Sequence, residues 1–348
     1  MPDVSSSTLN VGVTHLAVQR HERASRNALR YLAYLFVALA LVFSVVAGMG
    51  GDVFYYRLAT EALIFGGFAM SVDLLLGITG MLSLGHALFF GLGAYVSGLV
   101  LKGIAPSFWL AMGVTLCVAL VVGTVAGIIA IRVRGVYFAL ITFGMAEVVS
   151  KAVYNTREIG GSDGIIGIPI VHVDFLFFSV SSNSALSFFL FVLVLVMGLY
   201  FLLEAMLQTP FGRLVKAIRA NESRVPFLGY SSQHAKLCVF ILASVVAALS
   251  GALYPMLRGF VSPELMFFHT SADAVITVIL GGVGTLIGPL YGSVILTTLK
   301  SVIGTYTQHQ QVVVGVLFML SVIFVPEGLI GHIKPRLNAW LMRGEAKS

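Results

Sequence analysis

The sequence predicts an all-α polytopic membrane protein with about eight to ten transmembrane helices, some of them broken or re-entrant. Of its 348 residues, 58% are hydrophobic and 10% are charged, whereas soluble domains are about 25% charged. The mean hydropathy is +0.98. The apolar residues form long runs rather than the stripes of a water-facing helix, so the solvent around them is expected to be lipid.

Nine apolar runs approach or reach the length of a helical span, since about 20 residues cross about 30 Å of hydrocarbon. They cover residues 31–50, 58–77, 84–101, 109–131, 136–154, 185–207, 237–254, 272–299 and 312–330. The first run can span by itself, so we expect it to be retained rather than cleaved as a signal peptide. The chain is thus predicted to have a polar tail at 1–30, a transmembrane domain at 31–330 and a second tail at 331–348.

Basic residues predict the orientation of these spans. If the Arg-rich tail is cytoplasmic, Arg132 and Arg134 also fall inside, as does the basic segment 209–236, and the acidic segment 155–183 falls outside. This agrees with the positive-inside rule. The net charge of +6 is therefore interpreted as loop charge, and no nucleic-acid partner is expected.

The parity of the crossings predicts a re-entrant segment. Nine single crossings would put the basic tail 331–348 outside, so one run must count as zero or two crossings. The run 272–299 is the best candidate, because glycine and proline would break one helix in its middle. These residues are Gly281, Gly282, Gly284, Gly288, Pro289 and Gly292. The stretch G-I-T-G-M-L-S-L-G at 77–85 is a second interruption, and two such segments indicate a transport pathway.

Catalytic chemistry is not expected of this chain. It has no G-x-x-x-x-G-K-[ST] motif for ATP and no cluster of His, Cys and carboxylates typical of a hydrolase or metal site. Cys117 and Cys238 lie in apolar runs, which argues against a disulfide framework. We therefore expect no catalytic residue, bound cofactor or metal.

The segment 209–230 predicts a basic amphipathic helix. Thr209 can cap its start with Pro210 in the first position, and Pro226 and Gly229 close the segment. Cationic residues recur at helical spacing beside an apolar strip. They are Arg213, Lys216 and Arg219, beside Leu214, Val215 and Ile218. Basicity alone would also fit a helix that lies on anionic lipid.

The run F-G-R-L-V-K-A-I-R-A-N-E-S-R-V-P-F-L-G-Y in this segment resembles the cytoplasmic coupling loop of LivM-type permeases. These are membrane subunits of branched-chain amino acid ABC importers, of the type II permease kind. Further segments resemble other parts of the family, in the family's order. They are 71–95, 132–143, 160–169 and 281–292.

The resemblance implies an assembly in the bacterial inner membrane with both termini cytoplasmic. Its partners would be a LivH-like second permease, LivG-like and LivF-like ATPases that bind ATP and Mg, and an extracytoplasmic substrate-binding protein. The coupling loop would dock into a groove on an ATPase. Within it we expect Gly212 to allow close approach, Arg213 and Arg219 to contact the ATPase, and Asn221 and Glu222 to fix the helix end. The full coupling set is Gly212, Arg213, Lys216, Ala217, Arg219, Asn221, Glu222 and Gly229.

Asp73 lies inside an apolar run, where a carboxylate is a functional candidate by default. It either faces the pathway or, neutral and protonated, hydrogen-bonds a broken helix. No intramembrane Lys or Arg suggests itself as a partner, and many members of the family carry Asn at this position. The other predicted pathway residues are Thr79, Ser83, His86, Gly281, Gly282 and Thr285. For His86 we favour an interhelical hydrogen bond.

Two other classes of function remain open. An ion-coupled secondary transporter could use Asp73 as a proton relay, and a passive channel would have the glycine-broken segments in its favour. Within the ABC importer class, members of the family carry branched-chain and other amino acids, urea, short amides or aromatic carboxylates. The external segment 160–169 either receives the binding protein or forms a turn.

Overall fold

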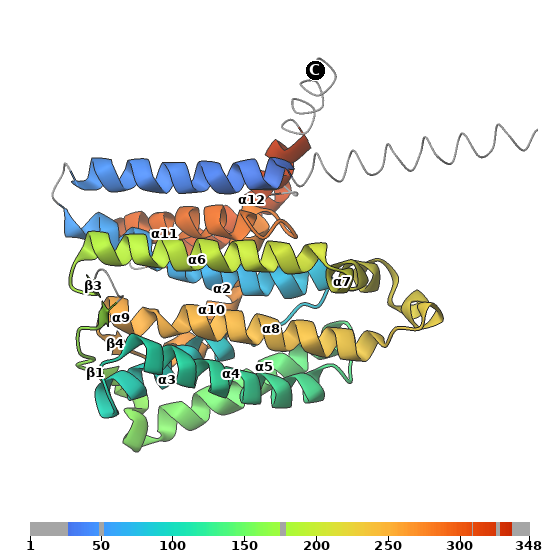
Figure 1. Ribbon diagram of the computed structural model, residues 1–348, viewed down its shortest axis with the longest axis horizontal. Coiled ribbons are helices and arrows are strands. Elements are labelled where there is room, and N and C mark those ends of the chain that lie inside the picture. The colour runs from blue at the N-terminus through green and yellow to red at the C-terminus, as the bar shows by residue number, and fades with distance from the viewer. Residues whose placement is uncertain (1–26, 49–51, 175–178, 308, 325–327, 336–348) are drawn as a thin grey trace, which may run out of the picture.

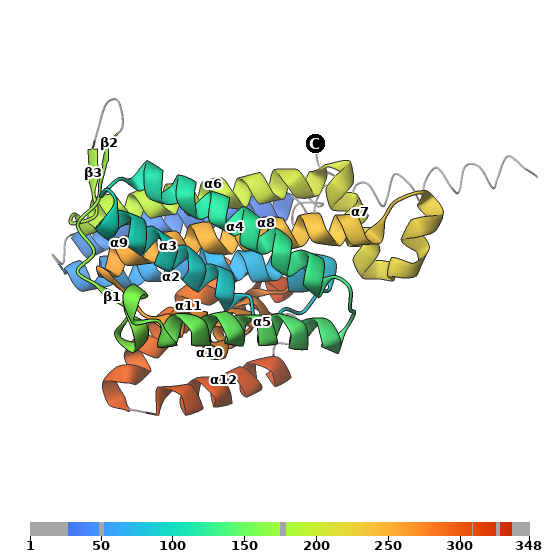
Figure 2. The ribbon, with the colours of Figure 1, turned by 90° about the horizontal axis from the view of Figure 1, so that it is seen from below.

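The computed structural model describes residues 27–48, 52–174, 179–307, 309–324 and 328–335. Within these ranges the chain is a bundle of roughly parallel helices whose ends gather at two opposite faces (Figures 1 and 2). Six of the helices are long and apolar enough to cross a membrane. The predicted all-α, multi-pass membrane class is confirmed. Residues 1–26 and 336–348 of the two predicted tails lie outside the described residues.

The helices follow one another with short connections. In chain order they are Asn27–Gly48, α2 (Val53–Asp73) with the π-helix η1 (Leu74–Thr79), α3 (Ala87–Gly103), α4 (Phe108–Ala130), α5 (Val136–Asn155), η2 (Arg157–Ile159), η3 (Gly161–Asp163), α6 (Ala185–Gln208), α7 (Pro210–Asn221), η4 (Glu222–Leu228), α8 (Ser232–Ala252), α9 (Tyr254–Arg258), η5 (Pro263–Met266), α10 (Phe268–Gly281), α11 (Gly288–Tyr306) and α12 (Gln310–Phe324).

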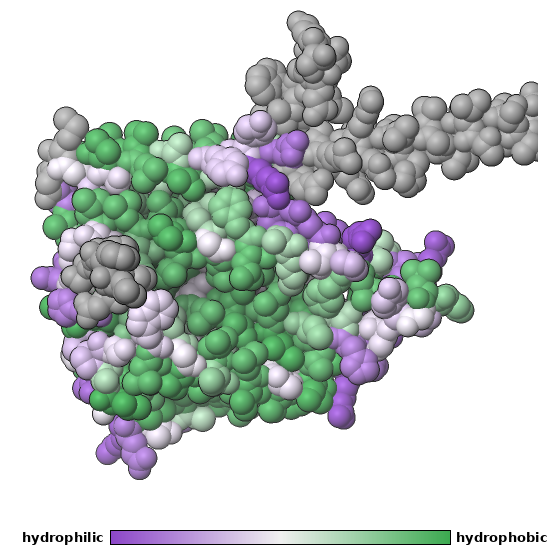
Figure 3. Space-filling model, viewed as in Figure 1, coloured by the Kyte–Doolittle hydropathy of each residue, from purple (hydrophilic) through white to green (hydrophobic). Residues whose placement is uncertain are grey.

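Helix α2 is the central element of the bundle. Of its most apolar window 89% is buried, against 28% for α4 and α5, and α2 contacts α6, α8, α10 and α11. Small residues bring the backbones close, as is typical between membrane helices. A Cβ on Gly93 would lie 2.0 Å from the Ala248 carbonyl oxygen, for example. The outer helices expose the apolar belt visible in Figure 3, which is the surface that lipid would cover.

The first predicted interruption, which we call the first break, is present. Helix α2 passes into a π-helix that ends at Gly80, whose φ of 75° is left-handed, and the chain becomes helical again at Ala87. Single π-turns are often found at functional positions. Between the two helices, Gly85 packs against α5 so closely that a Cβ would lie 1.9 Å from the Thr142 carbonyl oxygen.

The second interruption is a re-entrant hairpin. Helices α10 and α11 run antiparallel, because a Cβ on Gly281 would lie 2.0 Å from the Gly288 carbonyl oxygen and one on Gly292 would lie 2.2 Å from that of Thr277. The Thr285 hydroxyl closes the tip, donating to the Gly282 carbonyl oxygen at 2.7 Å and accepting from the Gly288 N–H at 3.0 Å. The run 272–299 therefore enters and returns on one side, and adds no net crossing.

One end of the bundle carries most of the basic loops, and we call it the basic end. It consists of the α4–α5 linker 131–135, the segment 209–231 and the last described residues 328–335. Arg30 also lies there, since its Nε donates to Glu204 Oε1 at 2.7 Å near the end of α6. Burial, together with repulsion from Lys216 of α7, lowers the pKa of Lys334. Both extremities of the described chain thus meet at the same end.

The opposite end, which we call the sheet end, carries two small antiparallel sheets that the sequence did not predict. Strand β1 (Ile165–Ile166) pairs with β4 (Phe260–Val261), and β2 (His172–Asp174) pairs with β3 (Ser179–Ser181). Strands of two or three residues are too short to show an alternating pattern. Strands β1 and β4 contact α3, and β4 also contacts α9, whereas β2 contacts α4 and β3 contacts α6.

Substitution of Gly292 by Ala should destabilise the protein by about 1–3 kcal/mol, because the new methyl group would overlap backbone of α10. The apparent melting temperature of the detergent-purified protein measures the effect. Gly198→Ala in α6 is the matched control, since a Cβ there meets nothing within 4 Å. Equal melting temperatures for the two variants would contradict the hairpin packing.

Candidate functional site

The two interruptions meet at Asp73, the last residue of α2. Its Oδ1 accepts a hydrogen bond from the Gly284 N–H at 2.6 Å, and its Oδ2 accepts one from the Leu286 N–H at 2.8 Å. The side chain is fully buried. Both carboxylate oxygens are thus used to hold the tip of the hairpin against the end of α2.

Gly77 of η1 makes this contact possible. A Cβ on Gly77 would lie 2.0 Å from Asp73 Oδ1 and 2.4 Å from the Gly284 nitrogen. Any side chain there would therefore separate the hairpin tip from the carboxylate. We call the group formed by Asp73, Gly77, Gly284, Leu286 and Arg219 the break junction.

Arg219 connects this junction to helix α7. Its Nη1 donates to the Gly77 carbonyl oxygen, and a Cβ on Gly284 would lie 3.2 Å from the same nitrogen. The guanidinium also attracts the Asp73 carboxylate electrostatically. The sequence suggested no cation near Asp73, yet Arg219 contacts Gly77 and Gly284, which both pack against that carboxylate. Two N–H donors and a nearby cation compensate for the burial of the charge.

The family resemblance predicts that Arg219 contacts an ATPase, and this stays a prediction. In the described chain its guanidinium donates to the first interruption, at Gly77. The expectation could not anticipate this, because Arg219 and Gly77 lie 142 residues apart. A single side chain of α7 therefore reaches both interrupted segments.

The start of α7 forms as the sequence predicts. The Thr209 side chain accepts from the Gly212 N–H at 3.4 Å, and Pro210 occupies the first turn. Gly212 allows close approach within the chain itself, since a Cβ would lie 2.3 Å from the Leu207 carbonyl oxygen. It permits the tight turn from α6 into α7. The remaining coupling residues on this helix comprise exposed Arg213 and Lys216 and half-buried Ala217.

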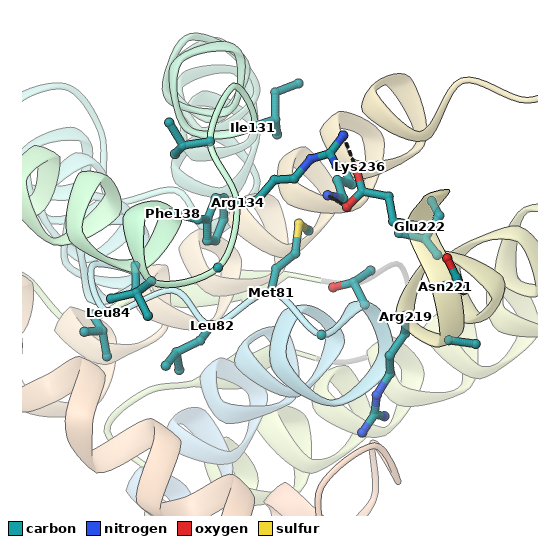
Figure 4. Close-up of a pocket in the computed structure, with 18 residues that line it drawn as sticks. Met81, Leu82, Leu84, Ile131, Arg134, Phe138, Arg219, Asn221, Glu222 and Lys236 are labelled. Atoms are coloured by element: carbon teal, nitrogen blue, oxygen red, sulfur yellow. Dashed lines mark ion pairs between the residues drawn. The ribbon is translucent and has the colours of Figure 1, made fainter. Parts of the chain in front are cut away.

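Asn221 and Glu222 lie at the end of α7. Asn221 Oδ1 accepts from the Ser223 N–H at 3.1 Å and caps η4. Glu222 pairs with Lys236 of α8 at 2.6 Å and with Arg134 of the α4–α5 linker at 3.4 Å. Figure 4 shows both ion pairs. Glu222 thus ties this helix end to two other parts of the bundle, and Gly229, with φ of 81°, ends η4.

A cavity of about 680 Å³ lies at the basic end beside α7. The first break, the α4–α5 linker and the α7–η4 segment form its walls (Figure 4). The predicted pathway residue Thr79 lines it, together with Arg219 and Glu222. A displacement of α7 would therefore change the shape of this cavity directly.

Three apolar side chains are exposed where η4 and the following turn project beyond the bundle (Figure 1). The exposed fractions are 90% for Phe227, 68% for Leu228 and 56% for Tyr230. They belong to the segment that resembles the coupling loop, but their exposure could not be predicted from the sequence. Exposed apolar side chains beside cations are typical of a surface that binds a partner.

The other predicted pathway residues divide into two groups. His86 is buried, its Nε2 lies 3.3 Å from the Ala243 carbonyl oxygen of α8, and its ring stacks on Phe68. It is the interhelical contact that the sequence favoured. Ser83 is also buried, and its hydroxyl has no hydrogen-bond partner among the described residues. Gly281, Gly282 and Thr285 belong to the hairpin tip and its closing turn.

Comparisons with known proteins identify similar transport proteins. The family described as branched-chain amino acid transport system / permease component matches residues 54–325. The chain is 29% identical over 336 residues to the high-affinity branched-chain amino acid transport system permease protein LivM of Salmonella typhimurium. The identity to LivM of Escherichia coli is the same. Each alignment covers 91% of this chain and 77% of the relative. It is 23% identical to LivH of S. typhimurium over 79% of this chain and 92% of that protein. No solved structure matches.

Substitution of Asp73 by Asn should weaken the break junction without abolishing it. Asn retains one acceptor oxygen but turns an NH₂ donor toward a backbone N–H, so one of the two tip hydrogen bonds is lost, at a cost of about 1–3 kcal/mol. Asp73→Leu removes both bonds and should cost more. Thermal unfolding in detergent measures this order. Unchanged stability of both variants, combined with altered substrate affinity, would instead place Asp73 in the pathway.

Proposed function

The chain belongs to the family of permease components of branched-chain amino acid transport systems, and from this premise we propose that it is one permease subunit of an ATP-driven importer for branched-chain amino acids. The relatives are permease proteins of transport systems rather than enzymes. Similarity to both LivM and LivH proteins supports a second permease of related sequence as partner. The chain has no phosphate-binding loop, so ATP and Mg would be bound by two separate ATPases.

The observation that carries this proposal is the continuity between the exposed segment 222–230 and the break junction. Phe227, Leu228 and Tyr230 offer apolar anchors to a partner, while Arg219 on the adjoining helix contacts the first break. An ATPase that binds the projecting segment 222–230 would therefore act on both interrupted segments. In the assembly the basic end and both termini face the cytoplasm, as the positive-inside rule favours.

Closure of the ATPases around nucleotide would displace α7 relative to the bundle. Because Arg219 contacts Gly77 and lies against Gly284, the end of α2 and the hairpin tip would move with it. The pathway between the two permeases would then alternate between outward-open and inward-open states. Substrate would reach the sheet end from the extracytoplasmic binding protein, for which the external segment 160–169 is the proposed docking surface.

The ion-coupled alternative has less support. A proton relay needs a carboxylate that exchanges protons with a water-filled path, whereas both oxygens of Asp73 accept backbone hydrogen bonds in a fully buried position. Proteoliposomes that contain all subunits distinguish the two functions. We expect uptake of leucine to require internal ATP and to persist with a protonophore; uptake by the isolated chain without ATPases would contradict the proposal.

Substitution of Phe227 by Ser should weaken binding of the ATPases, because the most exposed apolar anchor of the projecting segment is lost. We expect at least about tenfold weaker association, which corresponds to about 1.4 kcal/mol. Co-purification of the ATPases with the membrane subunits in graded detergent washes measures it. Tyr137→Ser is the matched control, since Tyr137 is 71% exposed at the same end but outside the segment. Equal loss of ATPase co-purification in both variants would contradict the assignment of segment 222–230 as the docking surface.

Substitution of Arg219 by Glu should uncouple ATP hydrolysis from uptake. The variant loses the bond to Gly77 and places a second carboxylate near Asp73. We expect uptake per ATP hydrolysed to fall at least about tenfold, or about 1.4 kcal/mol, while the ATPases remain bound. Arg132→Glu, an exposed charge reversal at the same end, is the control. Normal uptake by the Arg219 variant would remove this residue from coupling.

A further inference from the structure

A second cavity, of about 710 Å³, lies beside the re-entrant hairpin and is separate from the break junction. It is bounded by α2, α3, α9, η5, α10, α11 and α12. Figure 2 shows α12 passing along the outside of α10 and α11. Its lining residues on the hairpin, such as Asp273 and Lys300, belong to the parts of α10 and α11 far from the tip. The cavity size is that of a small-molecule site.

Two ion pairs form part of its wall. Glu61 of α2 pairs with Arg258 of α9, and Asp273 of α10 pairs with Lys300 of α11. All four residues line the cavity, and their side chains are 21–44% exposed. Charged residues inside apolar helices are costly unless they pair or face a water-filled space, and they commonly mark a substrate path. None of the four was singled out from the sequence.

These pairs retain capacity for a ligand. The bond to Asp273 uses one of the three donors of the Lys300 ammonium, and each carboxylate can accept more than one hydrogen bond. Glu264 of η5 also lines the cavity, is exposed and forms no ion pair with the residues that the structure describes. A ligand with one cationic and one anionic group could therefore be bound without displacing either pair from its elements.

The rest of the wall is apolar. Aromatic rings from four helices line it, together with aliphatic side chains of α2 and α10. The Phe and Tyr members are Phe54, Phe65, Phe90, Tyr254 and Phe268. An apolar wall with a few convergent polar groups is the usual composition of a small-ligand site, in which the polar groups set orientation.

We propose that this cavity binds the free amino acid in transit, as a zwitterion with an apolar side chain. The α-carboxylate is bound by Lys300, the α-ammonium by Asp273 and Glu264, and the aliphatic side chain lies against the aromatic rings. A singly charged analogue would leave one of these groups without its counterpart, and this sets the selectivity. The inference rests on the proposed function, because it assigns a binding site to the substrate of the same importer.

The proposed amino acid site and the break junction lie on the same hairpin. Asp273 and Lys300 lie on the two arms of the hairpin whose tip is held by Asp73. A displacement of the tip is carried along α10 and α11, which are in backbone contact through Gly281 and Gly292. The same rigid hairpin thus carries the amino acid at one end and the break junction at the other.

Equilibrium binding of radiolabelled leucine to the complete importer, purified without the binding protein, tests the site. We expect saturable binding against which 4-methylpentanoate, which lacks the ammonium group, and isoamylamine, which lacks the carboxylate, compete at least tenfold more weakly than leucine. The double variant Asp273→Asn/Lys300→Met should bind leucine at least tenfold more weakly. Lys151→Met, an exposed change on α5, should bind it normally.

A second double variant distinguishes loss of the binding site from loss of folding. Asp273→Lys combined with Lys300→Asp keeps an ion pair on the hairpin but reverses its direction relative to the aromatic wall, so it should fold and still bind leucine weakly. Normal affinity in either double variant, equal competition by the singly charged analogues or no saturable binding to the wild type would overturn the site. ATP-dependent uptake by the same wild-type importer, reconstituted in proteoliposomes with the binding protein added, separates this outcome from failure of the proposed function, in which uptake would not require ATP.

Discussion

The structure depends on how unwound backbone is satisfied inside the membrane. Lipid offers no hydrogen bonds, so each interruption must find its partners within protein. Here the hairpin tip donates to Asp73 at the end of α2, and the Gly77 carbonyl of the first interruption accepts from Arg219 of α7. The arrangement also explains why the two breaks lie side by side, because neither could end in hydrocarbon alone.

Much of the fold follows from local pattern. Long apolar runs predict the spans, and a glycine- and proline-rich centre predicts that 272–299 cannot be one helix. Parity of the basic loops then requires a segment with no net crossing, and the antiparallel α10 and α11 provide it. Thr209 and Pro210 likewise determine the start of α7 through contacts within one turn. Each of these properties is set by residues close together in the sequence.

The partners within the site could not be predicted, because they depend on packing between distant segments. Asp73 and Gly284 are 211 residues apart, and one sequence carries no signal that pairs them. Arg219 has the spacing of an outward-facing cation, yet its long side chain reaches back to Gly77. The ion pairs Glu61–Arg258 and Asp273–Lys300 show the same limit. A charged residue inside an apolar run can be recognised as unusual from the sequence, but the sequence does not identify its partner.

Glu222 adds a second connection between α7 and the bundle. It is shared by Lys236 and Arg134, and the latter belongs to the short linker between α4 and α5. Helix α5 is largely peripheral, although Gly85 packs against it at Thr142. A pull on the end of α7 would therefore be divided, with Arg219 transmitting one share inward to the breaks and Arg134 carrying the other sideways to α5. The peripheral helix α5 would therefore move together with the two central breaks.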